Sequence, residues 1–254
     1  MDENLLRAQQ KLLPSSVEYL QRINDENKLL FLIDETMGLL DQFDLVVTRA
    51  RISLIKLNYL YYKNDNMYTK IEQRIKQKAG NNADQLKSIY FLRDSDSEIK
   101  KIVELVQQNG QPKMRVKATL LQVYHLALHN KVKMARDLLK KTHIGQMLSV
   151  STNDRVENQV LYNRALTQIG MAFFRLGKIQ ESHEVLVEIF QNIRFRELLA
   201  QSINKHYEKT AEQEAEEKKR MIPAHMAINI QTLESIHYIT SMLIEIPMLS
   251  ENQH

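Results

Sequence analysis

Apolar residues recur along this chain at three- and four-residue spacing, which places them on one face of an α-helix. In residues 29–40 the pattern consists of Leu29, Leu30, Ile33, Met37 and Leu40. In residues 45–62 it is denser and forms a wider stripe of Leu45, Ile52, Ile55, Tyr59 and Tyr62. No segment alternates apolar and polar residues for long enough to predict a strand. The pattern therefore predicts an all-α fold.

Capping and turn residues predict the helix boundaries of the first half. Residues 1–13 are polar and are expected to form a frayed arm. Ser15 follows Pro14 and precedes Glu18 by three residues, an arrangement that resembles a capping box. Residues 64–66 (NDN) predict a turn, and a polar helix at 71–78 is expected to end in a loop at Gly80. Further helices are expected at 84–92 and 96–108.

A break at residues 109–112 (NGQP) predicts a subdivision, because glycine accepts left-handed dihedral angles and proline cannot continue a helix. Beyond it we predict two helix pairs, 114–129 with 131–141 and 158–176 with 178–191. Turns of one or two residues force such helices to be antiparallel, and a stack of helical hairpins is a solenoid. The predicted organisation is an arm at 1–13, a helical bundle at 14–110, helical repeats at 111–247 and a tail at 248–254.

The second hairpin is similar to a tetratricopeptide unit in the positions of Leu166, Ile169, Gly170, Phe173, Gly177 and Leu186. The match is incomplete, since Ser182 stands at the usual small position and Arg194 at the closing proline, while the first hairpin keeps only Ala135 and Leu139. We therefore predict divergent repeats without a regular period. The residues expected to pack the hairpins are Tyr124, Ala135, Tyr162, Gly170, Phe173 and Gly177.

The last part of the chain predicts two further helices of opposite character. Residues 203–221 are rich in charges with favourable i,i+4 pairs, and we expect this helix to face solvent. After Pro223 a strongly apolar helix is expected to begin near Met226 and to stop at Pro247.

Composition narrows the class of protein. Of 254 residues, 43% are apolar, with only 6 glycines and 4 prolines, so turns are scarce and helices are long. The chain has no cysteine, which excludes disulfides and thiolate metal sites and fits a cytosolic setting. We expect neither a leader sequence nor a membrane span. A formal net charge of +4 permits nucleic-acid contact without requiring it.

The residues give no indication of catalysis. His125 and His129 have the spacing of two zinc ligands, but Leu126 replaces the general-base glutamate, and packing histidines are the favoured interpretation. Glu234 and His237 form a single ExxH pair, where di-iron bundles require two. Phosphate-binding glycine loops are absent. We therefore predict a protein that is not an enzyme and has no cofactor or metal.

Basic residues gather on the first hairpin, at Lys131, Lys133, Arg136, Lys140 and Lys141, and also at Lys113, Arg115 and Lys117. They predict a salt-sensitive contact with the RNA backbone, because aromatic residues that would stack on bases are not interleaved. The alternative is an ordinary solvated face. The sequence leaves both open.

Three sequence blocks resemble the family of the C subunit of eukaryotic translation initiation factor 3. The first is VYHLALH at 123–129 with ARDL at 135–138, and the second is LYNRA at 161–165 with GMAFFRLG at 170–177. The third is PAHMAIN at 223–229 with LIEIP at 243–247. The run from 115 to 247 covers about half the chain, and the first half is similar only in outline.

The resemblance implies a PCI-type protein, in which a right-handed, tetratricopeptide-like solenoid leads into a winged helix that is expected to lie outside this chain. It further implies a cytoplasmic, non-catalytic scaffold that pairs chiefly with the A subunit of the factor. Such a scaffold contacts other initiation factors and places the complex on proteins and rRNA of the small (40S) ribosomal subunit. The alternative is a PCI-type lid component of the proteasome or the signalosome.

Overall fold

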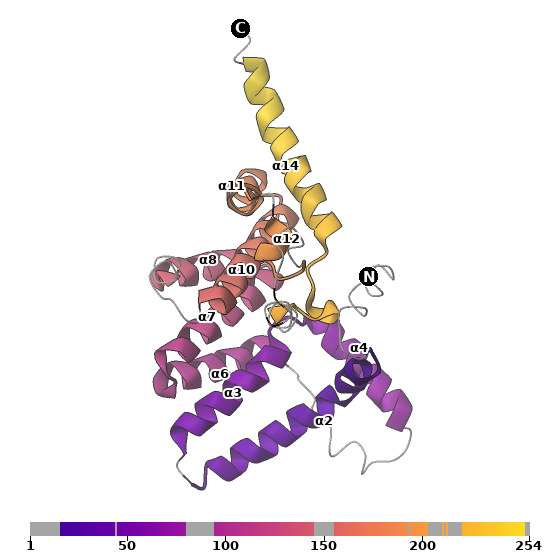
Figure 1. Cartoon of the computed structure of the whole chain (residues 1–254), viewed down its shortest axis with the longest axis vertical. Helices are drawn as coiled ribbons and strands as arrows, with labels where there is room; N and C mark the ends of the chain where they lie inside the picture. Colours follow the sequence, from indigo (N-terminus) through magenta and orange to yellow (C-terminus); the bar gives the residue numbers. More distant parts are fainter. Residues whose placement is uncertain are drawn as a thin grey trace. The chain divides into compact units, whose positions relative to one another are not determined.

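The computed structural model describes residues 16–43, 45–79, 94–144, 155–192, 194–202, 210, 212 and 220–251. Every regular element within these ranges is a helix (Figure 1). The all-α prediction is confirmed for this part of the chain. The helix expected at 84–92 and the capping residue Ser15 lie outside the described residues, as does most of the charged helix expected at 203–221.

The chain divides into two compact units, whose boundary falls within one helix. The N-terminal unit is Val17–His125, and the C-terminal unit runs from Leu126 onward. The N-terminal unit contains helices α2 (Ser16–Leu40), α3 (Val46–Leu60), α4 (Asp65–Ala79), α6 (Ser95–Asn109) and the larger part of α7 (Pro112–Leu128). Helix α3 packs along α6 (Figure 1). The subdivision predicted after Gly110 stays a prediction.

The buried face of α3 differs from the predicted stripe. Leu45 and Ile55 are 50% and 45% exposed, so the prediction is wrong for these two residues. The buried positions of the helix are Ala50, Ser53, Leu54, Lys56, Leu57 and Leu60. Ser53 and Lys56 are polar, so apolar periodicity did not predict the face that they share with the buried leucines.

Asn64 caps the start of a helix, at a position where the sequence predicted a turn. Its side-chain Oδ1 accepts a hydrogen bond from the backbone N–H of Met67 at 2.9 Å, which satisfies a donor that the first helical turn leaves unpaired. Helix α4 therefore starts at Asp65 rather than at residue 71. The same residue types that favour turns also favour helix caps.

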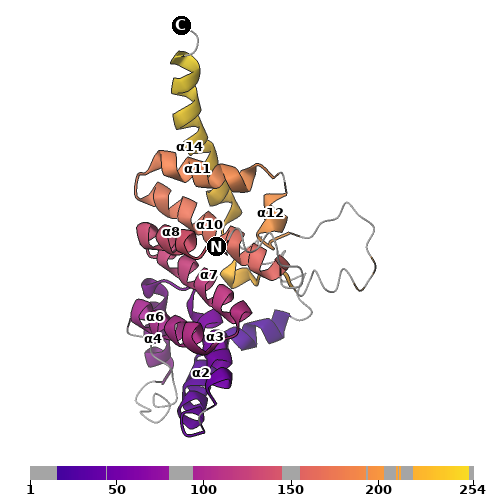
Figure 2. The same cartoon turned by 90° about the vertical axis from the view of Figure 1, so that its left-hand side faces the viewer.

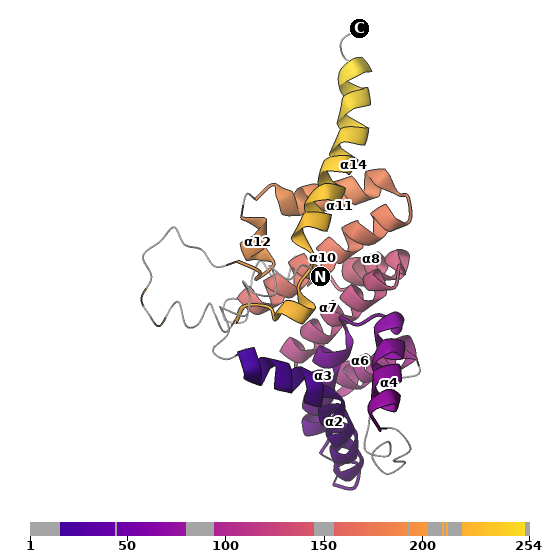
Figure 3. The ribbon, with the colours of Figure 1, turned by 90° about the vertical axis from the view of Figure 1, so that its right-hand side faces the viewer.

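The C-terminal unit contains α8 (Val132–Lys141), α10 (Arg155–Arg175), α11 (Ile179–Phe190), the short α12 (Phe195–Leu198), a 3-10 turn at Ala224–Met226 and α14 (Ile230–Glu251). Helix α11 lies along α10, and α14 packs on α11 (Figures 2 and 3). One apolar core joins these helices, and its buried members are Leu166, Leu186, Ile189, Phe195, Leu199, Leu233 and Ile236.

The turns before α8 and α11 have the same geometry. Three residues separate the helices at each turn, rather than the one or two predicted. Asn130 and Gly177 adopt left-handed φ angles of 61° and 71°. The next residue then donates a backbone hydrogen bond across the turn, from Lys131 to Leu126 at 2.8 Å and from Lys178 to Phe173 at 2.9 Å. This Schellman-type closure gives the two hairpins a common turn.

Helix α14 does not stop at Pro247, as the sequence predicted. It begins at Ile230 and continues through Pro247 to Glu251. Proline lacks the N–H that would bond to the carbonyl of Leu243, so it removes one hydrogen bond without ending the helix. Met226, the predicted start of this helix, belongs instead to the preceding 3-10 turn.

Candidate functional site

The five basic residues of the predicted RNA contact lie on α8 and immediately before it. Lys131, Lys133, Lys140 and Lys141 are exposed. Arg136 is half-buried, and its guanidinium carbon lies 5.9 Å from the centroid of the Phe173 ring on α10. Four of the five basic residues are therefore solvent-exposed lysines, and the fifth is an arginine that packs against α10.

A groove of about 420 Å³ lies between α8, α10 and α11. Its floor is apolar, and its rim on the α8 side is basic. The floor residues are Leu139, Tyr162, Leu166, Ile169 and Val185, and the rim residues are Arg136, Lys140 and His143. Leu166 belongs to the buried core, and Leu139, Tyr162 and Val185 pack against that core, so the floor is an exposed edge of the hydrophobic core.

Tyr162 lies in this floor and is half-buried. Burial raises the pKa of its phenol, and the negative charge of Glu188 on α11 raises the pKa further. The hydroxyl therefore stays protonated at neutral pH and remains a hydrogen-bond donor.

Helices α10 and α11 approach each other closely at Gly170. A Cβ atom at this position would lie 2.6 Å from Cδ2 and 2.7 Å from Cγ of Leu186. Across the same contact, the hydroxyl of Ser182 donates to the carbonyl of Gly170 at 2.9 Å. The contact between these helices therefore requires a residue without a side chain at position 170.

Arg164 connects the second and third sequence blocks, and sequence reasoning gave it no role. Its side chain is fully buried, and its Nη2 donates to the carbonyl of Met226 at 2.6 Å. Gln201 extends the network, because its Oε1 accepts from Arg164 Nη1 at 3.4 Å and its Nε2 donates to the carbonyl of Ile228 at 2.8 Å. The only signal for this role in the sequence was the position of Arg164, a charged residue within a predicted helix of the repeats.

Arg175 makes a similar connection between the two hairpin turns. Its Nε donates to Oδ1 of Asn130 at 2.8 Å, and its Nη2 donates to the carbonyl of Ala127 at 3.0 Å. The guanidinium fork thus bonds to both a side chain and the backbone of the other turn. Arg164 and Arg175 therefore connect residues of the three sequence blocks.

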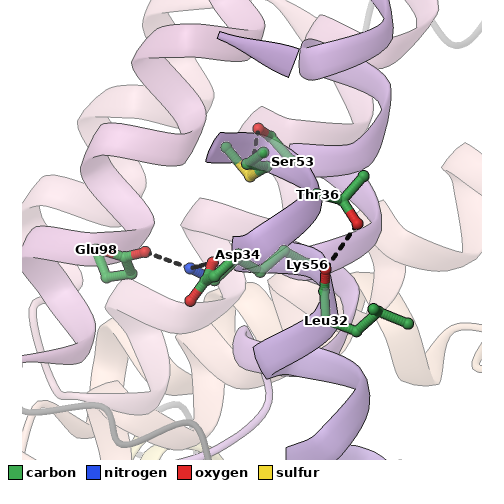
Figure 4. A network of polar contacts seen from close by, with 7 residues as sticks. Leu32, Asp34, Thr36, Ser53, Lys56 and Glu98 are labelled. Carbon is green, nitrogen blue, oxygen red and sulfur yellow. Dashed lines mark hydrogen bonds and ion pairs between the residues drawn. The ribbon is translucent and has the colours of Figure 1, made fainter. Parts of the chain in front are cut away.

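Buried charge organises the N-terminal unit. The Lys56 side chain on α3 is only 5% exposed, and its ammonium group lies 2.6 Å from a carboxylate oxygen of Asp34 on α2 and 2.6 Å from one of Glu98 on α6. Figure 4 shows the two carboxylates converging on this nitrogen from different helices. One lysine therefore ties three helices together.

A second buried ion pair lies after the end of α3, between Lys63 and Glu26 of α2. Two tyrosines surround it, with the Lys63 ammonium 5.5 Å from the Tyr62 ring centroid and 5.7 Å from that of Tyr68. Burial raises the pKa of both phenols, and the charge of Glu26 raises them further. Both hydroxyls are therefore neutral donors at physiological pH.

Of the two histidines of the zinc alternative, His125 lies on α7 and His129 follows the end of that helix. His125 is buried, with Nδ1 3.3 Å from the carbonyl oxygen of Tyr61 and Nε2 3.2 Å from Oδ1 of Asp96. Both ring nitrogens thus have protein atoms at hydrogen-bonding distance within the N-terminal unit. His129 lies one turn later along the chain and is half-buried.

The ExxH pair on α14 also has identifiable neighbours. Glu234 accepts a hydrogen bond from Arg196 Nη2 at 2.7 Å. The ring of His237 stacks on Phe190 at 4.1 Å and lies parallel to His183 at 6.4 Å. Burial lowers the pKa of His237, and the nearby His183 lowers it further. Glu234 therefore connects α14 to α12, and His237 contributes to the contact between α14 and α11.

The far part of α14 exposes a row of apolar side chains at Tyr238, Met242, Ile246 and Leu249. This part of the helix projects beyond α11 (Figures 1 and 3). Contiguous exposed apolar residues are typical of protein interfaces. Among the helices that the structure describes, none is both long and apolar enough to cross a bilayer.

Comparison with known proteins gives a consistent result over the whole chain. The model of the family described as "Eukaryotic translation initiation factor 3 subunit 8 N-terminus" matches residues 1–254. Proteins named as the C subunit of eukaryotic translation initiation factor 3 are similar to the chain. The one from Coccidioides immitis is 32% identical over 99% of this chain and 30% of its own length. The one from Culex quinquefasciatus is 30% identical over 100% of the chain and 27% of its length. The one from Caenorhabditis elegans is 31% identical over 98% of the chain and 26% of its length.

The chain thus spans less than a third of the length of these curated relatives. The match nevertheless includes all three sequence blocks and the first half, which the sequence alone related to the family only in outline. The chain belongs to the family of the C subunit of eukaryotic translation initiation factor 3.

Proposed function

We propose that this chain is a non-catalytic scaffold within eukaryotic translation initiation factor 3, which helps to assemble the factor in the cytoplasm and to dock it on the small (40S) ribosomal subunit. Family membership over residues 1–254 is the observation that supports this proposal. Packed helices with exposed apolar and basic surfaces are suited to binding other macromolecules rather than to catalysis. A PCI-type, right-handed solenoid is the architecture that we propose for the whole repeat region.

The contact with other components of the factor, chiefly its A subunit, is assigned in this proposal to the exposed apolar row of α14. Met242 and Ile246 are both more than half exposed, so replacing both with glutamate removes apolar contact area without disturbing the core. The double variant is expected to retain its melting temperature and to lose co-purification with the other subunits. Unchanged co-purification would remove α14 from the interface.

The contact with the ribosome is assigned to the exposed lysines of the α8 surface. Lysines that neutralise RNA phosphates release counterions, and each such contact contributes about 0.7–0.9 to the slope of log affinity against log salt. We expect the triple variant Lys131→Glu, Lys133→Glu, Lys141→Glu to bind purified small subunits more weakly and with a slope smaller by about 2.

A charge-matched control is available in the N-terminal unit. Lys70, Lys100 and Lys101 are exposed, and reversing these three lysines changes the net charge by the same amount. A sedimentation assay across a salt titration compares the two triple variants with the unchanged chain. Equal loss of binding in both variants would show that net charge, and not the α8 surface, governs the association.

A further inference from the structure

The groove between α8, α10 and α11 combines two features that the proposed ribosome contact does not use together. Its floor of leucine, isoleucine, valine and tyrosine side chains is continuous with the hydrophobic core. Its rim carries Arg136, Lys140 and His143 on one side only. A volume of about 420 Å³ lies in the range of pockets that enclose a ligand group.

The basic rim is partly fixed in place before any partner binds. The guanidinium of Arg136 is held over the Phe173 ring, which leaves it less rotational freedom than an exposed arginine has. Lys140 is exposed, one turn of α8 further on. A positioned cation loses less entropy when it pairs with a carboxylate, so this rim is suited to an anionic partner.

The apolar floor decides which anionic partner fits the groove. A phosphate backbone that filled the groove would cover this floor without burying apolar groups of its own. A peptide can place a carboxylate against α8 and an apolar side chain on the floor at the same time.

We propose that this groove binds an acidic peptide segment of a partner protein, which inserts one apolar side chain onto the floor and pairs its carboxylates with Arg136 and Lys140. The proposal goes beyond the ribosome contact, since it names a protein ligand and a groove that, of the four exposed α8 lysines, only Lys140 lines. The peptide need not contact Lys131, Lys133 or Lys141, the three lysines that the ribosome experiment reverses.

The test uses the 254-residue chain and a short fluorescein-labelled peptide that has one phenylalanine between glutamates. Fluorescence anisotropy at physiological salt measures the dissociation constant. Lys140→Glu is expected to weaken binding about fivefold or more, because it reverses a charge on the rim. Lys133→Glu, on the same helix but outside the groove lining, is the matched control and is expected to change binding less than about twofold.

Two peptide variants test the floor and the charge separately. Replacing the phenylalanine with alanine is expected to weaken binding about tenfold, because it removes the anchor. Replacing the glutamates with glutamines is expected to abolish the difference between Lys140→Glu and the unchanged chain. Circular dichroism of the protein variants checks that they are folded, which we expect since both lysines are exposed.

Several outcomes would overturn the proposal. They are no peptide binding up to about 1 mM, equal losses in Lys140→Glu and Lys133→Glu, or an alanine peptide that binds as well as the phenylalanine peptide. A short oligouridylate provides the nucleic-acid arm. If it displaces the peptide, and if Lys140→Glu weakens it more than Lys133→Glu does, the groove is an RNA site instead.

Discussion

The two units of this chain stabilise their helix contacts by different means. In the N-terminal unit, buried lysines pair with carboxylates from neighbouring helices, as Lys56 does with Asp34 and Glu98. In the C-terminal unit Arg164 is a buried cation that donates to a backbone carbonyl and a glutamine, and a close helix contact depends on Gly170. In the described residues, buried ion pairs thus join helices of one unit, whereas a close helix contact and backbone hydrogen bonds join helices of the other.

The difference has a physical consequence for tolerance to change. An ion pair can be lost by neutralising either partner, and a buried lysine left without its carboxylates is costly. A close helix contact is instead sensitive to volume. The two units should therefore respond to different classes of substitution.

The largest effect is expected for Gly170→Leu. The added side chain would overlap Leu186, which is fully buried, and we expect a loss of about 3 kcal/mol or more in the free energy of unfolding. Gly38→Ala is the control, since a Cβ at position 38 meets no atom within 4 Å and alanine favours helix by about 1 kcal/mol. A melting temperature of Gly170→Leu equal to that of the unchanged chain would contradict the close contact.

The next effect tests charge pairing in the N-terminal unit. Asp34→Asn with Glu98→Gln keeps the shape of both side chains and leaves Lys56 buried beside neutral amides, so we expect a loss of about 2 kcal/mol. Lys56→Met should cost less, because the Asp34 and Glu98 side chains are 39% and 27% exposed and can regain water. Urea unfolding measures both variants. A larger loss in Lys56→Met would reverse the assignment of the lysine as the critical buried charge.

Arg164→Lys is expected to have a smaller effect of about 1.5 kcal/mol, although it keeps the positive charge. A lysine ammonium cannot donate from two nitrogens in the planar arrangement that reaches both Met226 and Gln201. Lys56→Arg is the converse exchange, at a site where the positive charge matters more than the planar arrangement of two donor nitrogens. If Arg164→Lys melts like the unchanged chain, backbone hydrogen bonding is not what holds this part of the C-terminal unit.

The smallest effect concerns pH. The pKa of His237 is lowered in the folded chain from its ordinary value of 6.5, chiefly by burial and then by His183, while Glu245 acts in the opposite direction. The unfolded chain therefore binds a proton at this histidine more readily than the folded chain does. The contribution of His237 to stability is fully present above pH 6.5 and is lost as the pH falls through the lowered folded pKa. The melting temperature should therefore decrease between about pH 7.5 and about pH 5.5.

His237→Phe is the matched variant for this pH effect. It retains an aromatic ring that can stack on Phe190 but has no group that titrates. The decrease in melting temperature on acidification should be smaller in this variant. An identical pH profile in both chains would exclude His237 as its source.

The sequence predicted the helices of the C-terminal hairpins well because they are long and their apolar positions are periodic. It also identified Gly170 and Gly177 from their offsets. The face of α3 was predicted wrongly because Ser53 and Lys56 are buried polar residues, and hydrophobic periodicity cannot detect a lysine whose partners come from α2 and α6. The helix start at Asp65 was missed because Asn64 favours a cap as well as a turn.

The candidate surfaces were predictable only in part. The basic residues of α8 were evident from composition, but the separation of Arg136 from the exposed lysines depends on Phe173, a residue of another helix. The groove is formed by three helices and has no linear motif. The roles of Arg164 and Gln201 likewise depend on contacts between distant segments. Between the two kinds of multi-subunit assembly considered from sequence, the family match favours the initiation factor.

The proposed role of the chain as a scaffold within eukaryotic translation initiation factor 3 can be tested through the proteins that bind it. The most direct measurement is quantitative mass spectrometry of proteins that co-purify with the tagged chain from eukaryotic cytosol. We expect enrichment of the other initiation factor 3 subunits together with small-subunit ribosomal proteins, and loss of the latter when Lys131, Lys133 and Lys141 are reversed. Enrichment of proteasome or signalosome components, or of neither initiation factor nor ribosomal proteins, would contradict it.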